Sequence, residues 1–473
     1  MSSDNAIAQQ DFAADGGTIS RQLGKFAHAL QYEDIPEAVR ERAKYLILDA
    51  VGIAFASTHY DFSDRILAGI RDLSGPGECS VIGLGDRLPL RDAVLMNSAL
   101  VHGLDYDDTH MAAIVHATSS CFPCALGVAE QLDLHGRDLL TAYVVGMEAA
   151  IRIGAAAKGG FHDVGFHPTG VIGHFAAAMI AGRLFGLDPA GIAAAQGIAG
   201  STAAGSQEFL SEGAWNKRIH PGWAGGAGIT AASLAKNGFV APSQPYEGRF
   251  GLFKAYLGDG ERKVDYAAIT DGLGVRWETP EMAIKPYPTC HFTHSIADSA
   301  LALQREHGLA ADDIARIRAF IPRETIELIS EPVANKKRPS SDYDAKFSTQ
   351  YITACCFVRG RLGLAELEPE ALNDSAILAV ADKVECEADT NSAFPTFFSG
   401  GVAVTTRDGR ELVHHERINR GAGDRALNGE EITEKFLENM ALVSTVAKAH
   451  TVRDLVLGLD TVAAPALARG LTA

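Results

Sequence analysis

The first half of the chain has the residue spacing of buried helices. From Ser20 to about Leu257, apolar residues recur every three or four positions among many alanines and glycines. This is the period of an α-helix with one face in a core. One helix is predicted to begin at Pro36, a residue suited to a first helical turn, and others to cover residues 139–156, 170–185 and 189–205. The pattern predicts a large all-helical domain.

The pattern changes at residues 271–288, where glycines and prolines interrupt the helical spacing. Strand-like runs follow at Ile314–Ile321 and Gly401–Thr406. The second run continues through Asp408-Gly409 into residues 411–415, which predicts a β-hairpin. Helical segments at 294–306 and 347–359 lie between these strands. We therefore expect a second, smaller α+β domain.

The helical pattern returns at Asn428–Ala449, behind a plausible asparagine cap and an acidic first turn. We expect this segment to rejoin the first domain. The predicted fold is thus mainly α with a smaller α+β domain. Residues 18–270 and 420–473 form the all-helical domain, residues 271–419 form an α+β lid, and residues 1–17 are a disordered tail.

Charge limits the partners of the chain. Its 473 residues carry a formal net charge of -17, a field that repels phosphate backbones and anionic lipid surfaces. We expect no nucleic-acid partner. The first residues lack the basic and apolar regions of a secretory signal, and no apolar stretch reaches the roughly 20 residues of a membrane span. The expected location is the cytoplasm, with no membrane contact.

The cysteines weaken the case for a metal or a disulfide. Seven cysteines are scattered without a regular ligand spacing, which predicts reduced thiols. Cys121 and Cys124, with the distant Cys290, could in principle hold an iron–sulfur cluster. No zinc-protease or nucleotide-binding motif is present in the sequence. We expect no metal and no cofactor.

The densest polar cluster lies between two apolar segments. It consists of His102, Asp105, Asp107, Asp108, Thr109 and His110, followed by His116. Three carboxylates within four positions repel one another, which raises the pKa of at least one of them unless a cation or a donor is near. The cluster is too polar for a core, and this crowding is typical of a functional site. The alternative to a functional site is a solvated helix end in which the aspartates are caps.

Two further clusters offer a base and a cation. His167 stands just ahead of a predicted helix, whose N-terminal N–H groups attract anions, so that His167 could move a proton beside a bound carboxylate. The alternative is a capping turn built by Pro168 and Thr169. Lys217 and Arg218 supply the positive charge that an anionic substrate needs, although both could instead extend into solvent.

A fourth cluster runs from Lys285 to His294 at the expected domain junction and includes His291. Substrate clefts often form at such junctions. A rigid proline-rich linker is the alternative, but it leaves the histidines unexplained.

These four clusters, in this order, resemble the MmgE/PrpD family, which includes 2-methylcitrate dehydratase, cis-aconitate decarboxylase and iminodisuccinate epimerase. The most specific pieces are Leu104-Asp-Tyr-Asp-Asp-Thr109, Gly165-Phe-His-Pro168 and the Lys217 segment. The resemblance spans roughly residues 20–450. It implies a large helical domain, a smaller α+β lid, a homodimer and no cofactor.

The resemblance also implies site residues. Catalytic positions of the family match Asp105, Thr109, His116, His167 and Lys217, and a further histidine matches His291. We add Arg218 and Lys285 as cations that would bind substrate carboxylates. Two departures stand out. Ala117-Thr118-Ser119 replaces a common His-Pro-Ser, and residues 332–339 contain no tyrosine, where decarboxylases carry one.

We therefore expect a cofactor-independent lyase, a dehydratase that removes a proton next to a carboxylate of a small di- or tricarboxylate of the 2-methylcitrate type. His167 is the expected base and His116 the expected acid. The alternatives are an epimerase of a dicarboxylate such as iminodisuccinate and a cis-aconitate-type decarboxylase. A non-catalytic carboxylate-binding protein is a further alternative, which the clustered histidines disfavour.

Overall fold

The computed structural model describes residues 17–258, 263–394 and 396–473. The chain packs as two compact units. Unit 1 comprises the residues up to Glu208, Trp215–Met282 and Asn428–Ala473, and unit 2 comprises Phe209–Ala214 and Ala283–Leu427. The predicted boundaries at 270/271 and 419/420 come earlier in the chain than the corresponding divisions, which fall after Met282 and after Leu427. The predicted disordered tail, Gly17 excepted, lies outside the described residues.

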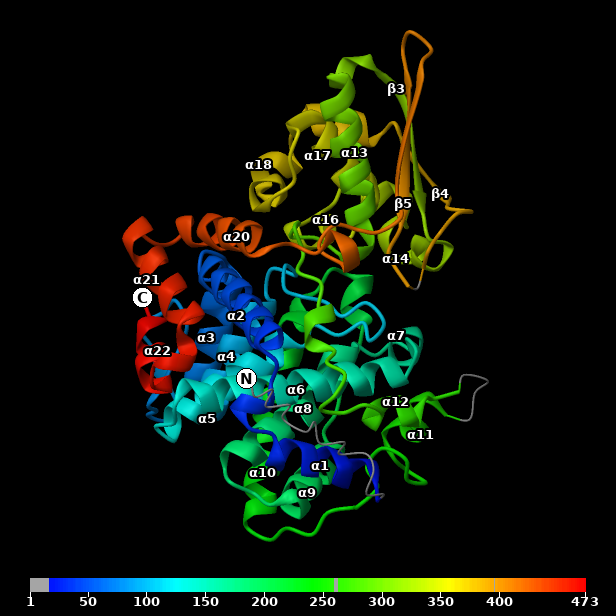
Figure 1. Ribbon diagram of the computed structural model, residues 1–473. Helices are drawn as coiled ribbons and strands as arrows, with labels where there is room; N and C mark the ends of the chain where they lie inside the picture. Colours follow the sequence, from blue (N-terminus) through cyan, green and yellow to red (C-terminus); the bar gives the residue numbers. More distant parts are fainter. Residues whose placement is uncertain (1–16, 259–262, 395) are drawn as a thin grey trace, which may run out of the picture. The chain divides into compact units, whose positions relative to one another are not determined.

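Unit 1 is built from helices, which Figure 1 colours from blue to green and again in red. Its α-helices are α1 (Ile19–Ala29), α2 (Glu37–Ser57), α3 (Asp61–Arg71), α4 (Leu90–His102), α5 (Thr118–Gln131), α6 (Gly136–Ala156), α7 (Gly160–Asp163), α8 (Pro168–Leu184), α9 (Pro189–Ala199), α10 (His220–Lys236), α11 (Leu252–Leu257), α12 (Tyr266–Thr270), α20 (Gly429–Ala441), α21 (Val446–Leu457) and α22 (Ala464–Gly470). Two short antiparallel strands, β1 (Cys79–Ser80) and β2 (Arg87–Leu88), interrupt the helical half, which the sequence did not predict.

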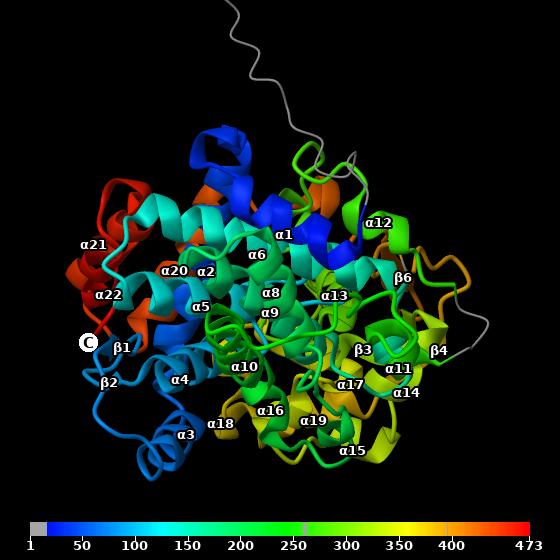
Figure 2. The same ribbon diagram turned by 90° about the horizontal axis from the view of Figure 1, so that it is seen from below.

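Helix α8 is the centre of unit 1. It packs against α5, α6, α9 and α10, which surround it in Figure 2. Small residues make this packing possible. A Cβ on Gly228 of α10 would lie 2.5 Å from the Cβ of Ala177 and 2.6 Å from the main-chain nitrogen of Ala178. The two helices therefore approach at a distance that suits glycine alone.

Helix α6 is long and apolar enough to cross a membrane by length and composition, and it is the one such helix among the described residues. Of its most apolar window, 94% is buried inside the protein. It packs against α5 and α8. Such burial is the behaviour of a core helix.

The C-terminal segment returns to unit 1, where α20 packs against α2. Asn428 caps α20 and forms a capping box with Glu431, as the sequence predicted. The predicted helix over residues 428–449, however, is two helices. Its continuity is broken because the Thr445 hydroxyl accepts a hydrogen bond from the Lys448 N–H and so begins α21 as a new helix.

Unit 2 combines a four-stranded sheet with helices. Its strands are β3 (Ile314–Ile321), β4 (Val384–Ala388), β5 (Gly400–Thr406) and β6 (Glu411–Glu416), in the order β4-β3-β5-β6. The other elements are α13 (His294–His307), α14 (Ile326–Ile329), α15 (Val333–Lys337), α16 (Asp342–Ala345), α17 (Thr349–Arg359), α18 (Pro369–Leu372) and α19 (Ser375–Ala381). Helix α13 packs against β3, β5 and β6, and α17 packs against β4.

The predicted hairpin is confirmed. Strands β5 and β6 pair antiparallel, with Gly409 in the left-handed region at φ 89° between them. Strand β4, which the sequence did not predict, pairs parallel to β3. The mainly α fold with a smaller α+β part is confirmed.

Candidate active site

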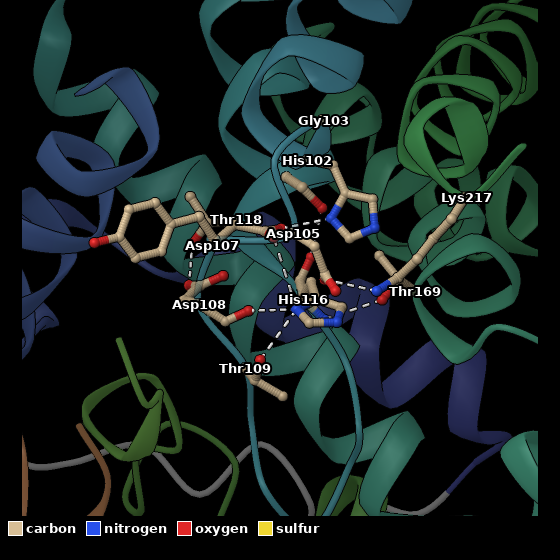
Figure 3. Close-up of polar contacts among 12 residues, drawn as sticks. His102, Gly103, Asp105, Asp107, Asp108, Thr109, His116, Thr118, Thr169 and Lys217 are labelled. Atoms are coloured by element: carbon tan, nitrogen blue, oxygen red, sulfur yellow. Dashed lines mark hydrogen bonds and ion pairs between the residues drawn. The ribbon is translucent and has the colours of Figure 1, made fainter. Parts of the chain in front are cut away.

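The polar cluster after α4 is buried. Asp105, Asp107 and Asp108 are each 1% exposed, so the solvated helix end that the sequence left open is wrong. The expectation that the cluster is too polar for a core is wrong for the same reason. The segment is buried because its polar groups find partners inside unit 1, as Figure 3 shows. Buried carboxylates without such partners would be too costly to keep.

Asp105 and Lys217 form the first of these pairs. The Lys217 ammonium donates to Asp105 Oδ1 at 2.6 Å, across 112 positions of sequence. Lys217 lies in a 3-10 turn, η3 (Trp215–Ile219), and is buried. Asp105 adopts φ 53°, a conformation that costs energy for a residue with a side chain. Backbone strain at a buried ion pair is typical of a functional site.

Arg218 follows Lys217 and is also buried. Its Nε donates to the main-chain oxygen of Gly103 at 2.8 Å. Its guanidinium carbon lies 4.3 Å from the centre of the Phe62 ring. The alternative in which Lys217 and Arg218 extend into solvent is therefore wrong. The contacts of Arg218 favour support of the segment after α4, and its role in carboxylate binding stays a prediction.

His102 and Asp107 form a second pair. Nδ1 of His102 lies 2.7 Å from Oδ2 of Asp107, which is a hydrogen-bond distance. Because an ionised carboxylate only accepts, Nδ1 carries the proton and Nε2 is the basic nitrogen. Oδ1 of Asp107 lies 3.9 Å from Nδ1 of His116. One carboxylate therefore hydrogen-bonds to His102 and lies within ion-pair distance of His116.

His116 is held by its own loop. Its Nδ1 lies 2.8 Å from the main-chain oxygen of Asp108 and 3.1 Å from the Thr109 hydroxyl. Since a carbonyl oxygen accepts, Nδ1 of His116 carries a proton and Nε2 has the lone pair. The backbone N–H of His116 donates to the Thr169 hydroxyl at 3.0 Å, which ties the loop to the first turn of α8. The geometry suits a base or acid that acts through Nε2.

His167 is the N-cap of α8, with Pro168 in the first turn, as the sequence predicted. Its Nδ1 lies 3.1 Å from Nδ1 of His220. Its ring centre lies 5.4 Å from that of His102 and 6.0 Å from that of His116. Burial, the Lys217 ammonium and the neighbouring histidines hold the pKa of His167 well below its usual value. His167 is thus a neutral imidazole, the form that can accept a proton.

Asp108 faces away from this group of rings. Its carboxyl accepts a hydrogen bond from the Thr118 hydroxyl, which also lies 2.7 Å from the Tyr143 hydroxyl. Burial raises the pKa of Asp108 to about 8, with a smaller contribution from the charge of Asp107. Burial is thus the main cause of the raised carboxyl pKa, and the repulsion between aspartates that their spacing predicted adds a smaller part.

One group among the described residues could hold a metal ion. It consists of His102, Asp107 and His116, whose possible ligand atoms all lie within 4.8 Å of one another. Two imidazoles and a carboxylate suit Zn²⁺ or Fe²⁺. The hydrogen bonds above place protons on both Nδ1 atoms, so a metal would have to displace them or bind at Nε2. The expectation of a metal-free site stays a prediction.

Lys285 and His291 belong to unit 2, where both are buried. Nδ2 of Asn419 lies 2.7 Å from Nε2 of His291. If that amide donates, Nε2 accepts and the proton of the neutral ring lies on Nδ1. The His291 ring centre lies 4.6 Å from that of His294. The binding roles of Lys285 and His291 stay predictions.

The cysteines do not favour an iron–sulfur cluster. All seven are free thiols. Burial in α5 raises the thiol pKa of both Cys121 and Cys124, whereas a metal ligand must be a thiolate. Cys290 belongs to unit 2.

Sequence reasoning gave no separate role to His102, Asp107 or His220. A helical spacing could have placed His102 on α4, but it could not show that the ring faces His167. Asp107 follows His102 by five residues, and this short separation could have suggested that the two side chains meet. His220 follows the Lys217 turn directly, and the sequence gave no reason to pair it with His167.

The sequence matches the models of a known protein family over most of its length. A family model for the MmgE/PrpD N-terminal domain matches residues 21–265, and one for the MmgE/PrpD C-terminal domain matches residues 287–461. The chain belongs to the MmgE/PrpD family.

Individual relatives are similar over nearly their whole length. The cis-aconitate decarboxylase-like protein oryM of Aspergillus oryzae is 29% identical over 94% of this chain and 95% of its own. Cis-aconitate decarboxylase of Aspergillus terreus is 28% identical over 93% of each chain. The mouse cis-aconitate decarboxylase is 26% identical over 89% of this chain and 86% of its own.

Proposed function

We propose that the protein is a lyase that acts on a small tricarboxylate by moving protons at a carbon next to a carboxylate. The observation that carries the proposal is the buried Lys217–Asp105 pair beside the imidazoles of His116 and His167. The ammonium offers a charge for a substrate carboxylate in a chain that is otherwise strongly acidic. The imidazoles offer groups that exchange protons near neutral pH.

The roles follow from the hydrogen bonds. In a reaction that begins with the removal of a proton, such as dehydration, His167, a neutral imidazole, takes the proton from carbon, and the electron pair of that C–H bond passes into the adjacent carboxylate system. Lys217 stabilises the added negative charge. His116, with its Nδ1 proton directed at a carbonyl oxygen, delivers a proton through Nε2 once it has been protonated. Thr109 orients His116 through its hydroxyl.

Two lyase reactions fit this set of groups. The relatives named as cis-aconitate decarboxylases favour release of CO₂ from a cis-aconitate-type acid. In that reaction the C–C bond to a carboxylate breaks, CO₂ leaves, and the electron pair of the bond is taken up by the carbon skeleton at a carbon that protonated His116 protonates through Nε2, while His167 removes no proton. We propose decarboxylation first on this ground.

A second candidate is dehydration of a 2-methylcitrate-type acid, which the sequence predicted. The absence of a tyrosine from residues 332–339 favours it. The nearest tyrosine along the chain, Tyr343, is buried in α16 of unit 2. In a dehydration, His167 takes the carbon-bound proton and His116 protonates the departing hydroxyl group as water.

One experiment separates the candidates. The full-length protein is incubated in D₂O with cis-aconitate, citrate, 2-methylcitrate and iminodisuccinate, and the mixtures are followed by ¹H and ¹³C NMR. Appearance of CO₂ and a deuterated dicarboxylate supports decarboxylation, and a new alkene with loss of water supports dehydration. Exchange with inversion supports the epimerase instead. No reaction and no exchange with any of the acids would contradict the proposal.

The Lys217→Met variant tests whether the reaction comes from this site, because it keeps the length of the side chain and removes its charge. A reaction that survives unchanged in this variant does not come from the site. The expected homodimer, the cytoplasmic location and the absence of a cofactor stay predictions.

A further inference from the structure

Unit 2 contains a cavity of its own, with a volume of about 360 Å³. Its walls come from three stretches of the chain: residues 209–213, residues 327–336 with α14 and α15, and residues 340–347 with α16. All three stretches belong to unit 2, and the residues of the proposed reaction are not among those that line the cavity. The volume falls within the range of pockets that hold small molecules. The cavity is therefore large enough for a ligand.

Lys336 supplies the one positive charge among the described residues that line this cavity. The residue is 6% exposed, and its ammonium lies 3.9 Å from Oδ1 of Asp344. That separation is beyond hydrogen-bond distance. Burial lowers the pKa of the ammonium, and the charge of Asp344 acts against this. Because a buried ammonium without a close acceptor is costly, a ligand that offers a carboxylate oxygen would stabilise Lys336.

Asp344 is held beside Lys336 by hydrogen bonds of its own. Its Oδ1 accepts from the side-chain amide of Asn335 at 2.9 Å, and its Oδ2 accepts from the main-chain N–H of Ser340 at 3.0 Å. These bonds fix the position of the carboxylate. Since a carboxylate has about four sites for donors, Asp344 keeps the capacity to accept from a ligand.

The two side chains thus place opposite charges next to each other in one cavity. An α-amino acid has the same feature, because its ammonium and its carboxylate are attached to one carbon atom. We propose that this cavity binds an α-amino acid with an apolar side chain: the ligand carboxylate accepts from the ammonium of Lys336, and the ligand ammonium donates to Asp344. This inference does not depend on the proposed reaction.

The rest of the lining favours such a ligand over a polyanion. Apolar side chains, among them Phe209, Leu328 and Phe347, offer contacts to an apolar side chain of the ligand. The exposed carboxylates of three glutamates also line the cavity, namely Glu212, Glu327 and Glu331. With Asp344 they make four carboxylates against one ammonium. This balance repels a di- or tricarboxylate but admits a ligand that has no net charge.

The ligand class separates this cavity from the candidate active site. In the active site the proposed substrate is a tricarboxylate, which Lys217 would bind. Lys336, however, lies within residues 332–339, the segment in which a tyrosine of the related decarboxylases would fall. The test must therefore distinguish an amino acid from a tricarboxylate in this cavity.

The test is isothermal titration calorimetry of the full-length protein with three ligands that share one carbon skeleton. L-Norleucine has both charges, hexanoate has the carboxylate alone, and hexylamine has the ammonium alone. L-Norleucine should bind at least about tenfold more tightly than either of the others, because each of these lacks one of the two paired charges. Citrate should not displace it.

Two variants assign the charges. Lys336→Met should weaken the binding of L-norleucine by about tenfold or more and should remove its advantage over hexylamine. Asp344→Asn should remove its advantage over hexanoate. Lys337→Met is the matched control, because the Lys337 ammonium donates to the main-chain oxygen of Asp382 at 2.7 Å and the residue does not line the cavity. Its affinity for L-norleucine should equal that of the unaltered protein.

If Lys336→Met does not fold, Leu328→Trp replaces it, since the larger side chain would fill the cavity from its wall and should remove binding. Equal affinities for L-norleucine and hexanoate, or no binding of L-norleucine, would overturn the proposal. Displacement of L-norleucine by citrate would also overturn it, in favour of a tricarboxylate site. Because binding is measured without turnover, failure to find a reaction for the protein would leave the result intact.

Discussion

Lys435 on the returning helix α20 holds the backbone of Tyr106 in the loop of the site. Its ammonium donates to the main-chain oxygen of Tyr106 at 2.9 Å and lies 2.7 Å from Oδ1 of Asp49. The same ammonium lies 3.7 Å from the centre of the Tyr106 ring. Tyr106 separates Asp105, the partner of Lys217, from Asp107, the partner of His102. One cation from the end of the chain thus fixes the residue between the two site carboxylates.

Replacement of Lys435 by Met should destabilise unit 1 by about 3–5 kcal/mol, because it leaves the buried carboxylate of Asp49 without its cation. Urea unfolding at pH 7 measures the change. The double variant Asp49→Leu with Lys435→Met should recover most of the stability but not the activity, since the Tyr106 carbonyl still lacks its donor. Full recovery of both would mean that Lys435 does not position the loop.

Replacement of Lys217 by Met should lower kcat on the true substrate by about 10²–10³, the effect of removing one charge-stabilising donor. Asp105→Asn should lower it less, because the amide oxygen still accepts from Lys217. Lys236→Met, on the exposed end of α10, is the control and should leave kcat unchanged. Equal losses in the Lys217 and Lys236 variants would remove Lys217 from the site.

Asp108 should make the protein less stable as pH rises. Its pKa is raised from 3.8 to about 8 in the folded state, so that between these values the folded protein holds a proton that the unfolded chain has released. The stabilisation that comes from this proton is fully present below about pH 4 and is lost as pH rises toward 8. In Asp108→Asn, the fall in unfolding free energy from pH 5 to pH 8 should be smaller than in the unaltered protein.

The Asp108 variant must be compared with the unaltered protein because buried histidines change the unfolding free energy with pH in the opposite direction. Burial lowers the pKa of His110 and His220 to about 4 each. As pH falls below about 6.5, these histidines bind protons in the unfolded chain but not yet in the folded protein. Their contribution to the unfolding free energy is therefore lost below about pH 6.5. Chemical denaturation at several pH values measures both effects, and parallel curves for the two proteins would contradict the raised pKa of Asp108.

The close approach of α8 and α10 gives a packing test. Gly228→Ala should destabilise the protein by about 1–3 kcal/mol, since the new methyl group would overlap Ala177. Gly226 lies on the same helix, where a Cβ would meet nothing closer than 3.8 Å. Gly226→Ala should therefore be neutral or stabilising, because alanine favours a helix over glycine by about 1 kcal/mol. Thermal unfolding of both variants checks the contrast.

Local patterns predicted the parts of the fold and site that depend on neighbours in sequence. Pro168 after His167 correctly placed the histidine at a helix start, and Asp408-Gly409 correctly placed the turn between two strands. The asparagine cap of α20 was predicted for the same reason. In each case the residues that fix the conformation lie within a few positions of one another.

The remaining features depend on contacts between distant segments. The spacing of apolar residues says nothing of the partner of Lys217, because Asp105 lies 112 positions away. The Lys435–Tyr106 contact spans 329 positions. The sequence also took the aspartates after α4 for a segment too polar to be buried, since burial of a carboxylate depends on partners that no local pattern reveals.

The return of the C-terminal segment to unit 1 sets the order in which a newly made chain can mature. The ribosome releases Asp49 and the loop at Asp105 early, and Lys435 only after the whole of unit 2 has emerged. Until that lysine emerges, the loop and the Asp49 carboxylate lack their cation, and unit 1 is incomplete. A chain cut short after Lys217 but before α20 carries every proposed catalytic residue and still lacks Lys435, so such a fragment should be inert and should be readily degraded.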